Sequence, residues 1–566
     1  MHPRTAAAAL AALAPLAVAT DGLSITSVFR PGDLVPDMPG FTMGGAGGTA
    51  SINDAGSVLY TATITGDGIT SSNDHVLIGG PLNGLSLIGR EREPIPTLPG
   101  WIYLPGSSNL TGFYQLAVAP DGGVAYQPTI FETGVSSTWL FGTFAGPVAT
   151  PSPIVWQTGP APGFDPGYTV NATTKVAFAD GGRAAVSGRA SGPTTEYVVW
   201  ASDPVNGTAV ALSSNAQAPG FGAGVEPLVI REASLCLNAQ GRLTTLAILE
   251  GPGITTSDRN VWFEGPLGGM SVLARQGDAV PFIPGATYST FDENKMRMNA
   301  AGDLCFAAQV VGGGTSAVLM RRHAGVLAPV VKVGDPVPDV PGATFTNLYS
   351  GHFDMNSHGD VMFGATLTGQ PAATDTAFFI ADDAGIRMVL REGDPLPGGY
   401  TTPHILTTRF FFNDRQQFVT DLNVDGRAAF FATRPNGELL KLARASEIFF
   451  TDDGFAGVIG SVVPWRYDAN SLAVGSGGPS MFSNEGQLIL SMFFTGSTGS
   501  GVFIFDVDDP CPADLVEPFG LLDLADVNAF VTGFIGMTAV GDLDGNGLWD
   551  LTDVNIFVNS FIGGCP

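Results

Sequence analysis

Oxygen-bearing side chains are spaced like calcium ligands near the C-terminal end of the sequence. The twelve-residue segment 542–553 carries oxygen donors at loop positions 1, 3, 5, 7, 9 and 12 and glycine at position 6. Calcium takes six to eight hard oxygen ligands, and a loop of this kind turns sharply at its glycine to surround the ion. The spacing predicts an EF-hand-like Ca²⁺ site. Its ligands are Asp542, Asp544, Asn546, the carbonyl of Leu548, Asp550 (which could act through water) and Asp553.

The alternative for this segment is a solvated acidic turn in which Asp553 caps a helix. A related but incomplete unit precedes it. There Asp523 and Asp526 hold positions 9 and 12, and Asp514 is one residue out of register with position 1. That first loop either holds a second calcium ion or keeps its shape through packing and a disulfide. Val, Phe, Val and Phe recur at helical spacing after both loops, which predicts two short amphipathic helices.

The four cysteines indicate an oxidising compartment. Cys511 and Cys565 bracket the last 55 residues, so we expect a disulfide that staples a small C-terminal module. Cys236 and Cys305 lie in apolar runs and are expected to be buried thiols.

The two loop–helix units resemble a dockerin. The Cys-Pro-Ala-Asp start at Cys511 and the Gly-Cys-Pro end at Cys565 resemble the GC-type subfamily, and the resemblance covers residues 509–566. It implies a calcium-dependent module that binds a cohesin-like protein or another cell-surface component. In dockerins, loop positions 10 and 11 often contact the partner; here these positions are Leu551, Thr552, Leu524 and Ala525.

An internal repeat of about 60 residues runs from residue 24 to about residue 508. Its clearest piece, Asn-x-x-Gly-x-x-x-aromatic, predicts a β-hairpin, because Asn bonds the backbone two residues on and Gly supplies positive φ. This piece also resembles a tandem-repeat family of exported proteins for which no activity is implied. The eight copies start at Asn53, Ala119, Asn171, Asn238, Asn299, Asn356, Asn423 and Ser483.

A second piece, Arg/Lys-x-Gly-Asp-x-x-Pro, forms a loop between β-rich runs in four units. Its aspartates are expected to bond their own backbone or the cation three residues before; a ring that binds cations or polyols is the alternative. They are Asp33, Asp278, Asp335 and Asp394.

Each unit holds about four strands. Repetition around an axis buries both faces of such sheets, so we predict a mainly β fold: a β-propeller of eight blades, with seven as the alternative count, and a small all-α calcium-loop module. A β-solenoid or a pair of stacked half-propellers would also accommodate a repeat of this kind.

The first residues have the features of a secretion signal. His2 and Arg4 precede an apolar run that ends in Ala-Val-Ala at residue 19, which predicts a signal peptide over 1–19, a propeller over 20–508 and an extracellular or cell-surface location. The chain has 25 basic and 52 acidic residues, which excludes nucleic-acid binding and argues against anionic membranes. No later stretch is long and apolar enough to span a bilayer.

Enzyme signatures are sparse. Six histidines are scattered, and no zinc-protease helix, nucleophile elbow or phosphate loop is found. His352 and His358 could lie near one hairpin and approach a metal, but a histidine that is merely exposed is the commoner case. We therefore predict a binding or structural module, with a polysaccharide or protein ligand on the propeller and no assigned catalytic residue. The alternative is an extracellular glycoside hydrolase or polysaccharide lyase carried by the same module.

Overall fold

The computed structural model describes most of the chain in two compact units. One consists of residues 25–447 and 458–508, and the other of residues 509–566 together with Ser24 and residues 448–457. The residues described are 24–103, 113–134, 140–179, 182–203, 206–348, 352–405, 410–434, 437–451, 456–462, 480–495, 499–507, 513, 515–516, 522–541, 543 and 548–563.

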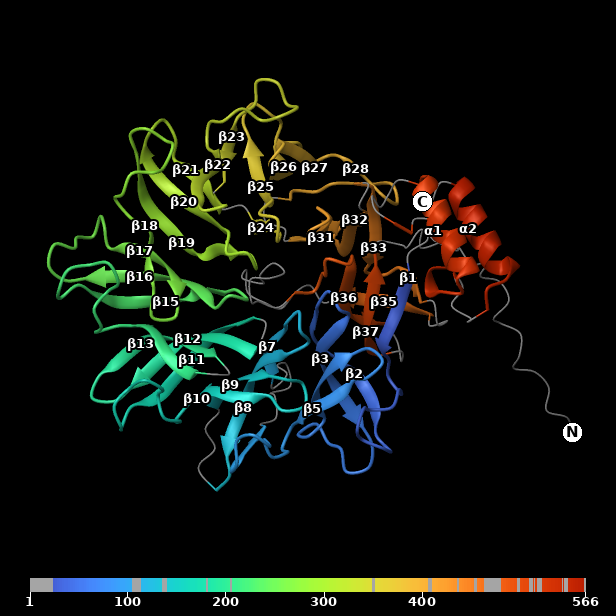
Figure 1. The fold of residues 1–566 in the computed structure, drawn as a ribbon, viewed down its shortest axis with the longest axis horizontal. Coiled ribbons are helices and arrows are strands. Elements are labelled where there is room, and N and C mark those ends of the chain that lie inside the picture. The colour runs from blue at the N-terminus through green and yellow to red at the C-terminus, as the bar shows by residue number, and fades with distance from the viewer. Residues whose placement is uncertain are drawn as a thin grey trace, which may run out of the picture. The chain divides into compact units, whose positions relative to one another are not determined.

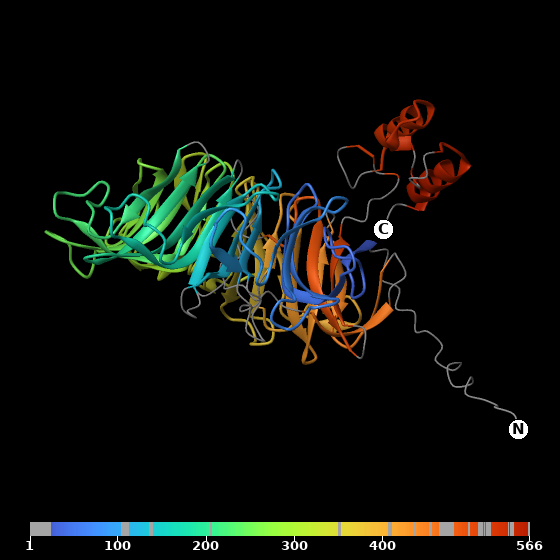
Figure 2. The ribbon, with the colours of Figure 1, turned by 90° about the horizontal axis from the view of Figure 1, so that it is seen from below.

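Eight sheets are arranged around one axis as the blades of a β-propeller (Figure 1), which confirms the predicted fold and the count of eight. Figure 2 shows the ring of blades edge-on. Blades 1 and 2 contain β2 (Thr42–Ile52), β3 (Ser57–Thr65), β4 (His75–Pro81) and β5 (Ser86–Arg90), then β6 (Trp101–Tyr103), β7 (Phe113–Val118), β8 (Val124–Glu132), β9 (Leu140–Gly146) and β10 (Ser152–Trp156).

Blades 3, 4 and 5 each have four strands that are hydrogen-bonded in chain order. Blade 3 is β11 (Thr169–Ala179), β12 (Arg183–Ser191), β13 (Thr195–Asp203) and β14 (Gly207–Ser213). Blade 4 is β15 (Glu226–Leu237), β16 (Arg242–Glu250), β17 (Asn260–Pro266) and β18 (Ser271–Arg275). Blade 5 is β19 (Ala286–Met298), β20 (Leu304–Gly312), β21 (Ala317–His323) and β22 (Val326–Lys332).

Blades 6 and 7 follow the same order. Blade 6 is β23 (Phe345–Asn347), β24 (Phe353–Met355), β25 (Val361–Leu367), β26 (Thr376–Asp382) and β27 (Gly385–Arg391), and a small pair, β28 (Pro395–Leu396) and β29 (Tyr400–Thr401), follows it. Blade 7 is β30 (Phe410–Phe412), β31 (Phe418–Val424), β32 (Arg427–Thr433) and β33 (Leu439–Arg444).

The eighth blade joins the two ends of the propeller. Its strands are β34 (Ile448–Phe450), β35 (Ala456–Val462), β36 (Gln487–Phe494) and β37 (Ser500–Asp506), and β1 (Ser24–Phe29) pairs with β37. The first strands of neighbouring blades lie beside one another, as β11 does with β15 and β15 with β19, which places them nearest the axis. The ring is therefore closed by a strand from the opposite end of the sequence.

The core lies between the blades, because both faces of each sheet are covered by its neighbours. On β17, Val261 and Phe263 pack with blade 3, whereas Trp262 packs with Phe306 and Met320 of blade 5. Successive side chains of a strand point to opposite faces, so a sheet buried on both sides has continuous apolar strands.

The repeated asparagine joins blades 1, 4, 5, 6 and 7 to the blade that follows each of them. The Oδ1 of Asn299 accepts the backbone N–H of Asp303 at 2.9 Å and closes the turn in which Gly302 has a φ of 89°. Its Nδ2 donates to the carbonyls of Asn356 at 3.2 Å and Ser357 at 3.0 Å in the following blade. The same inter-blade bond runs from Asn53 to Ala119, Asn238 to Ala300, Asn356 to Asn413 and Asn413 to Ser483.

Two of the eight predicted copies are wrong in register. Asn171 lies inside β11, and the third turn is the one that ends at Gly182. Asn423 is exposed on β31, and the seventh turn starts at Asn413 instead. There Gln416 takes the glycine position with a φ of 56°, so the missing glycine hid the copy from a sequence pattern.

We expect Asn299→Ala to lower the free energy of unfolding by about 1–3 kcal/mol, because it leaves buried backbone groups of two blades without partners. Chemical denaturation followed by tryptophan fluorescence measures the change. Asn423→Ala is the matched control and should stay within about 0.5 kcal/mol of the parent protein, since its side chain is exposed. Equal losses in the two variants would contradict the inter-blade role.

The 509–566 unit contains α1 (Leu524–Ile535), the short 3₁₀ helix η3 (Ala539–Gly541) and α2 (Leu551–Gly563), as the helical spacing predicted. None of the helices in the described ranges is long and apolar enough to cross a membrane.

Candidate functional site

The candidate site is the pair of loop–helix units at the C-terminal end, and its first unit is organised by two aspartates. Asp523 caps α1: its Oδ1 accepts the N–H of Ala525 at 2.6 Å. Asp526 is fully buried; its Oδ2 accepts the N–H of Asp523, and its Oδ1 accepts those of Leu515 and Val516. Burial raises the pKa of Asp526, but these N–H groups outweigh that effect and leave the pKa below its usual range.

The second unit repeats this geometry. The Oδ1 of Asp550 accepts the N–H of Thr552 at 2.7 Å at the start of α2. Asp553 is buried, and its carboxylate accepts the N–H of Asp550 at 2.9 Å and that of Leu543 at 2.7 Å. Each buried carboxylate therefore ties the beginning of its loop to the first turn of its helix.

Three of the six predicted calcium ligands, Leu548, Asp550 and Asp553, lie within the described residues. The ligands predicted at Asp542, Asp544 and Asn546 lie outside the described residues. Of the rest, Asp553 closes the loop, Asp550 lies beside it, and Leu548 turns its side chain outward with 62% exposed. All the predicted donors are oxygens, the type that Ca²⁺ requires. Asp550 and Asp553 also form the hydrogen bonds at the helix start that an acidic turn without metal would have. The observed contacts therefore agree with both the calcium loop and the solvated acidic turn.

The structure explains why Asp514 is one residue out of register with position 1 of the first loop. Leu515 and Leu543 both pack on the small core of this unit. Leu515 lies eleven residues before Asp526, whereas Leu543 lies ten residues before Asp553. Aligning the two leucines places Asp514 opposite Asp542 in sequence, with one additional residue in the first loop. The first loop thus has an acidic residue at the position that appeared to lack one.

The two helices pack through stacked aromatic rings. Phe530 and Phe557 are both 5% exposed, and their ring centroids lie 4.3 Å apart with an interplanar angle of 6°. They are one 27-residue repeat apart. With Ala513 they form the buried core of the unit, so the repeat has an internal pseudo-symmetry.

The positions implied for partner contact are all exposed. Leu551 and Leu524 are 76% and 71% exposed, and Thr552 and Ala525 are exposed beside them. On each helix the exposed face continues as a row of apolar side chains. The sequence analysis did not predict this row, although the 27-residue repeat indicates it. Its members are Val531 and Ile535 on α1 and Val558 and Ile562 on α2.

The cysteine predictions have different outcomes. Cys236 and Cys305 are buried free thiols, as predicted, and burial raises the pKa of Cys305 well above its usual value. Cys511 and Cys565 lie outside the described residues, so their disulfide stays a prediction.

The Gly-Asp loops have the scaffold role expected from their sequence. Asp33, Asp335 and Asp394 each accept the N–H of the residue three positions before, at 2.7 to 3.0 Å, and Asp335 also pairs with the Lys332 ammonium. The fourth loop differs, because Arg275 forms its ion pair with Asp258 at 2.6 Å instead of with Asp278.

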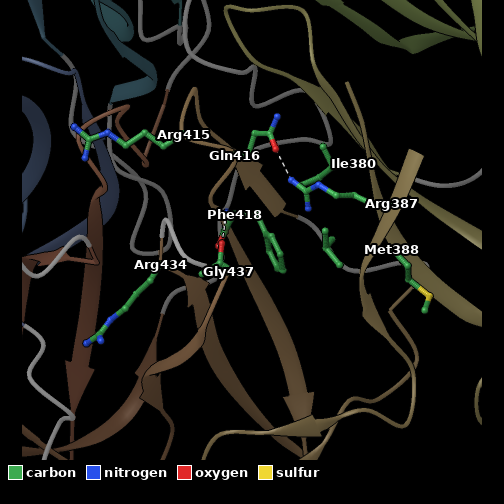
Figure 3. Close-up of a pocket in the computed structure, with 10 residues that line it drawn as sticks. Ile380, Arg387, Met388, Arg415, Gln416, Phe418, Arg434 and Gly437 are labelled. Atoms are coloured by element: carbon green, nitrogen blue, oxygen red, sulfur yellow. Dashed lines mark hydrogen bonds between the residues drawn. The ribbon is translucent and has the colours of Figure 1, made fainter. Parts of the chain in front are cut away.

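A cleft of about 360 Å³ lies between blades 6 and 7 and is lined by three arginines (Figure 3). Arg415 pairs with Glu485 at 2.6 Å, Arg434 pairs with Glu438 at 3.3 Å, and Arg387 donates to Gln416. Because acids or amides already engage each guanidinium, the arrangement does not by itself indicate an anion site.

Asp354 on β24 is a buried acid that the sequence analysis did not single out. Burial raises its pKa to about 7, against the lowering effect of Arg297 on β19, whose Nε lies 3.5 Å away. Both side chains are 3% exposed. The pair therefore joins blades 5 and 6 through a buried contact.

The sequence matches a family described as a family of unknown function, DUF7453, over residues 12–205 and 105–513, which include the whole ring of blades. The chain belongs to the DUF7453 family. This DUF7453 protein matches no curated protein. The description assigns no activity, so function has to be argued from the sites themselves.

Solved structures resemble the fold of this DUF7453 protein only generally. The propeller domain of the trilobed protease from Pyrococcus furiosus is 9% identical with a TM-score of 0.35, covering 70% of this chain and 98% of its own. The WD40 domain of SCAP from fission yeast is 10% identical (0.33; 86% and 98%). An exo-β-1,3-galactanase from Phanerochaete chrysosporium is 11% identical (0.22; 84% and 96%). Similarity at this level carries no argument about activity.

Proposed function

We propose that this protein is an exported β-propeller that acts as a binding or structural module and is attached through a calcium-dependent, dockerin-like C-terminal unit. The observation that carries the proposal is the repeated geometry of Asp526 and Asp553. Each closes an acidic loop on the start of an exposed helix. A ligand set of carboxylates, an amide and a carbonyl matches Ca²⁺, and ion binding would fix the loop relative to its helix.

The exposed apolar rows on α1 and α2 support a docking role. Leu524, Ile535, Leu551 and Ile562 are each more than 70% exposed. Contiguous exposed apolar side chains mark interaction surfaces on soluble proteins. The partner in this proposal is a cohesin-like protein or another surface component, and the propeller is what the module carries.

The test is a calcium titration of the full chain by calorimetry. We expect saturable binding that Asp553→Asn weakens at least tenfold, because it removes one ligand charge from the complete loop. Asp526→Asn is the matched change in the first unit. If it lowers the number of bound ions from two to one, the first loop also holds calcium. If the full chain binds no calcium, the docking proposal is wrong.

A further inference from the structure

Three ligand-type side chains meet on blade 1 of the propeller. Asp74 and His75 stand at the start of β4, and Glu91 directly follows β5. The Nδ1 of His75 lies 3.1 Å from Asp74 Oδ1 and 3.3 Å from Glu91 Oε2. The three atoms lie within 4.8 Å of one another, so one nitrogen and two carboxylate oxygens face a common point.

The blade repeat shows which residues take the position of Glu91 in other blades. Gln157 in blade 2 and Gln276 in blade 4 follow the last strand as Glu91 does, and each accepts a backbone N–H from the strand before it, at 2.6 and 3.3 Å. In blade 6 the equivalent residue is Glu392. Glu91 accepts the N–H of His75 in the same way at 3.3 Å. The neutral side-chain amide of a glutamine is sufficient to accept this backbone N–H. Glu91 instead places a carboxylate at this position, on a side chain that is wholly buried.

The Nδ1 of a protonated His75 donates one hydrogen bond, yet both carboxylates approach the same nitrogen. Asp74 Oδ1 and His75 Nδ1 are buried atoms, and neither has a hydrogen-bond partner. The two arginines of the loop turn elsewhere, Arg90 to Glu93 and Arg92 to the carbonyl of Ser72.

A metal ion satisfies all three groups at once. With metal–ligand bonds of about 2.0–2.2 Å, neighbouring ligand atoms of a tetrahedral site lie about 3.3–3.6 Å apart. The two short contacts at His75 Nδ1 approach this spacing.

We propose that Asp74, His75 and Glu91 bind a divalent transition-metal ion of the zinc type, with water as a fourth ligand. The imidazole nitrogen selects such an ion over calcium, which prefers oxygen ligands alone. Asp74 and His75 are 23% and 18% exposed, so the site borders solvent although its ligand atoms are buried. The bound ion ties the loop before β4 to the loop after β5.

A similar but looser group on blade 6 serves as a comparison. Asp375, Glu392 and His404 also lie within ligand distance of one another. His404 is 53% exposed and 3.8 Å from Glu392, whose Oε2 already accepts the Thr376 hydroxyl at 2.8 Å. We expect weaker metal binding there, and His404→Gln removes it from the measurement.

The experiment is a zinc titration by calorimetry on the full-length His404→Gln protein, stripped of metal and then saturated with calcium. We expect one zinc ion per chain with micromolar or tighter affinity, and a loss of at least tenfold when Glu91→Gln or His75→Gln is added. Zinc should also raise the unfolding temperature of the His404→Gln protein and leave that of the Glu91→Gln double variant unchanged.

Glu91→Gln is the decisive change, because it installs the residue that blades 2 and 4 already carry and should fold normally. Its unfolding temperature in chelator is the check on folding. Zinc affinity that is unchanged by both substitutions would overturn the proposal, and so would the absence of micromolar binding in the folded His404→Gln protein.

Discussion

Asp354→Ala is expected to lower the free energy of unfolding of the propeller by about 3–5 kcal/mol, because removing one member of a buried ion pair strands the other charge. Arg297 would remain buried over the ring of Phe353, with its Cζ 5.5 Å from the ring centroid. The measurement is chemical denaturation at about pH 8, above the pKa of about 7 that burial gives Asp354.

The double variant Arg297→Met/Asp354→Leu separates the cost of a stranded charge from the value of the pair. Replacing both partners by apolar residues of similar size is often neutral or stabilising. We therefore expect the double variant to recover most of the loss. If the single variant costs less than about 1 kcal/mol, Asp354 and Arg297 do not form the inter-blade pair described above.

Phe557→Ala is expected to melt the helical unit. Deleting a buried phenylalanine side chain costs about 3–5 kcal/mol, which is as much as the core of a domain this small supplies. Phe557 stacks on Phe530 and is one of the three buried apolar residues of that core. Calcium-saturated protein should lose helical circular dichroism and exchange its α1 and α2 amides rapidly.

Ile562→Ala is the matched control on the same helix, because its side chain is 80% exposed. Its helical signal and amide protection should equal those of the parent protein. If the Phe557→Ala variant kept both as well, the stacked pair would not hold the two helices together.

The architecture could be predicted because its cause is local and repeated. Turn residues recur about every 60 residues, and strands such as β17 are apolar at successive positions because both sheet faces are buried. The positions of the inter-blade turns were harder to predict. Asn-x-x-Gly at 423–426 forms a genuine turn, between β31 and β32, so nothing in the pattern distinguishes it from the inter-blade turn at Asn413.

The candidate sites also differ in how far apart their residues lie in the sequence. Calcium ligands fall within twelve consecutive residues, so their spacing alone predicts the loop. Asp74, His75 and Glu91 come from two loops, and the ion pair of Asp354 and Arg297 comes from two blades. Such groups can be identified only from the structure. For Glu91, the observed hydrogen bonds show that its position in the repeat is equivalent to those of Gln157 and Gln276.

The position of β1 beside β37 has a consequence for how the chain folds. The strand that completes blade 8 is made first, and its partner more than 470 residues later, so this contact has a very large sequence separation and forms slowly. Until β1 pairs with it, β37 has an open edge that can pair with another chain. Ring closure is therefore expected to be the last step of folding, and chains interrupted before residue 500 should aggregate rather than form a smaller ring.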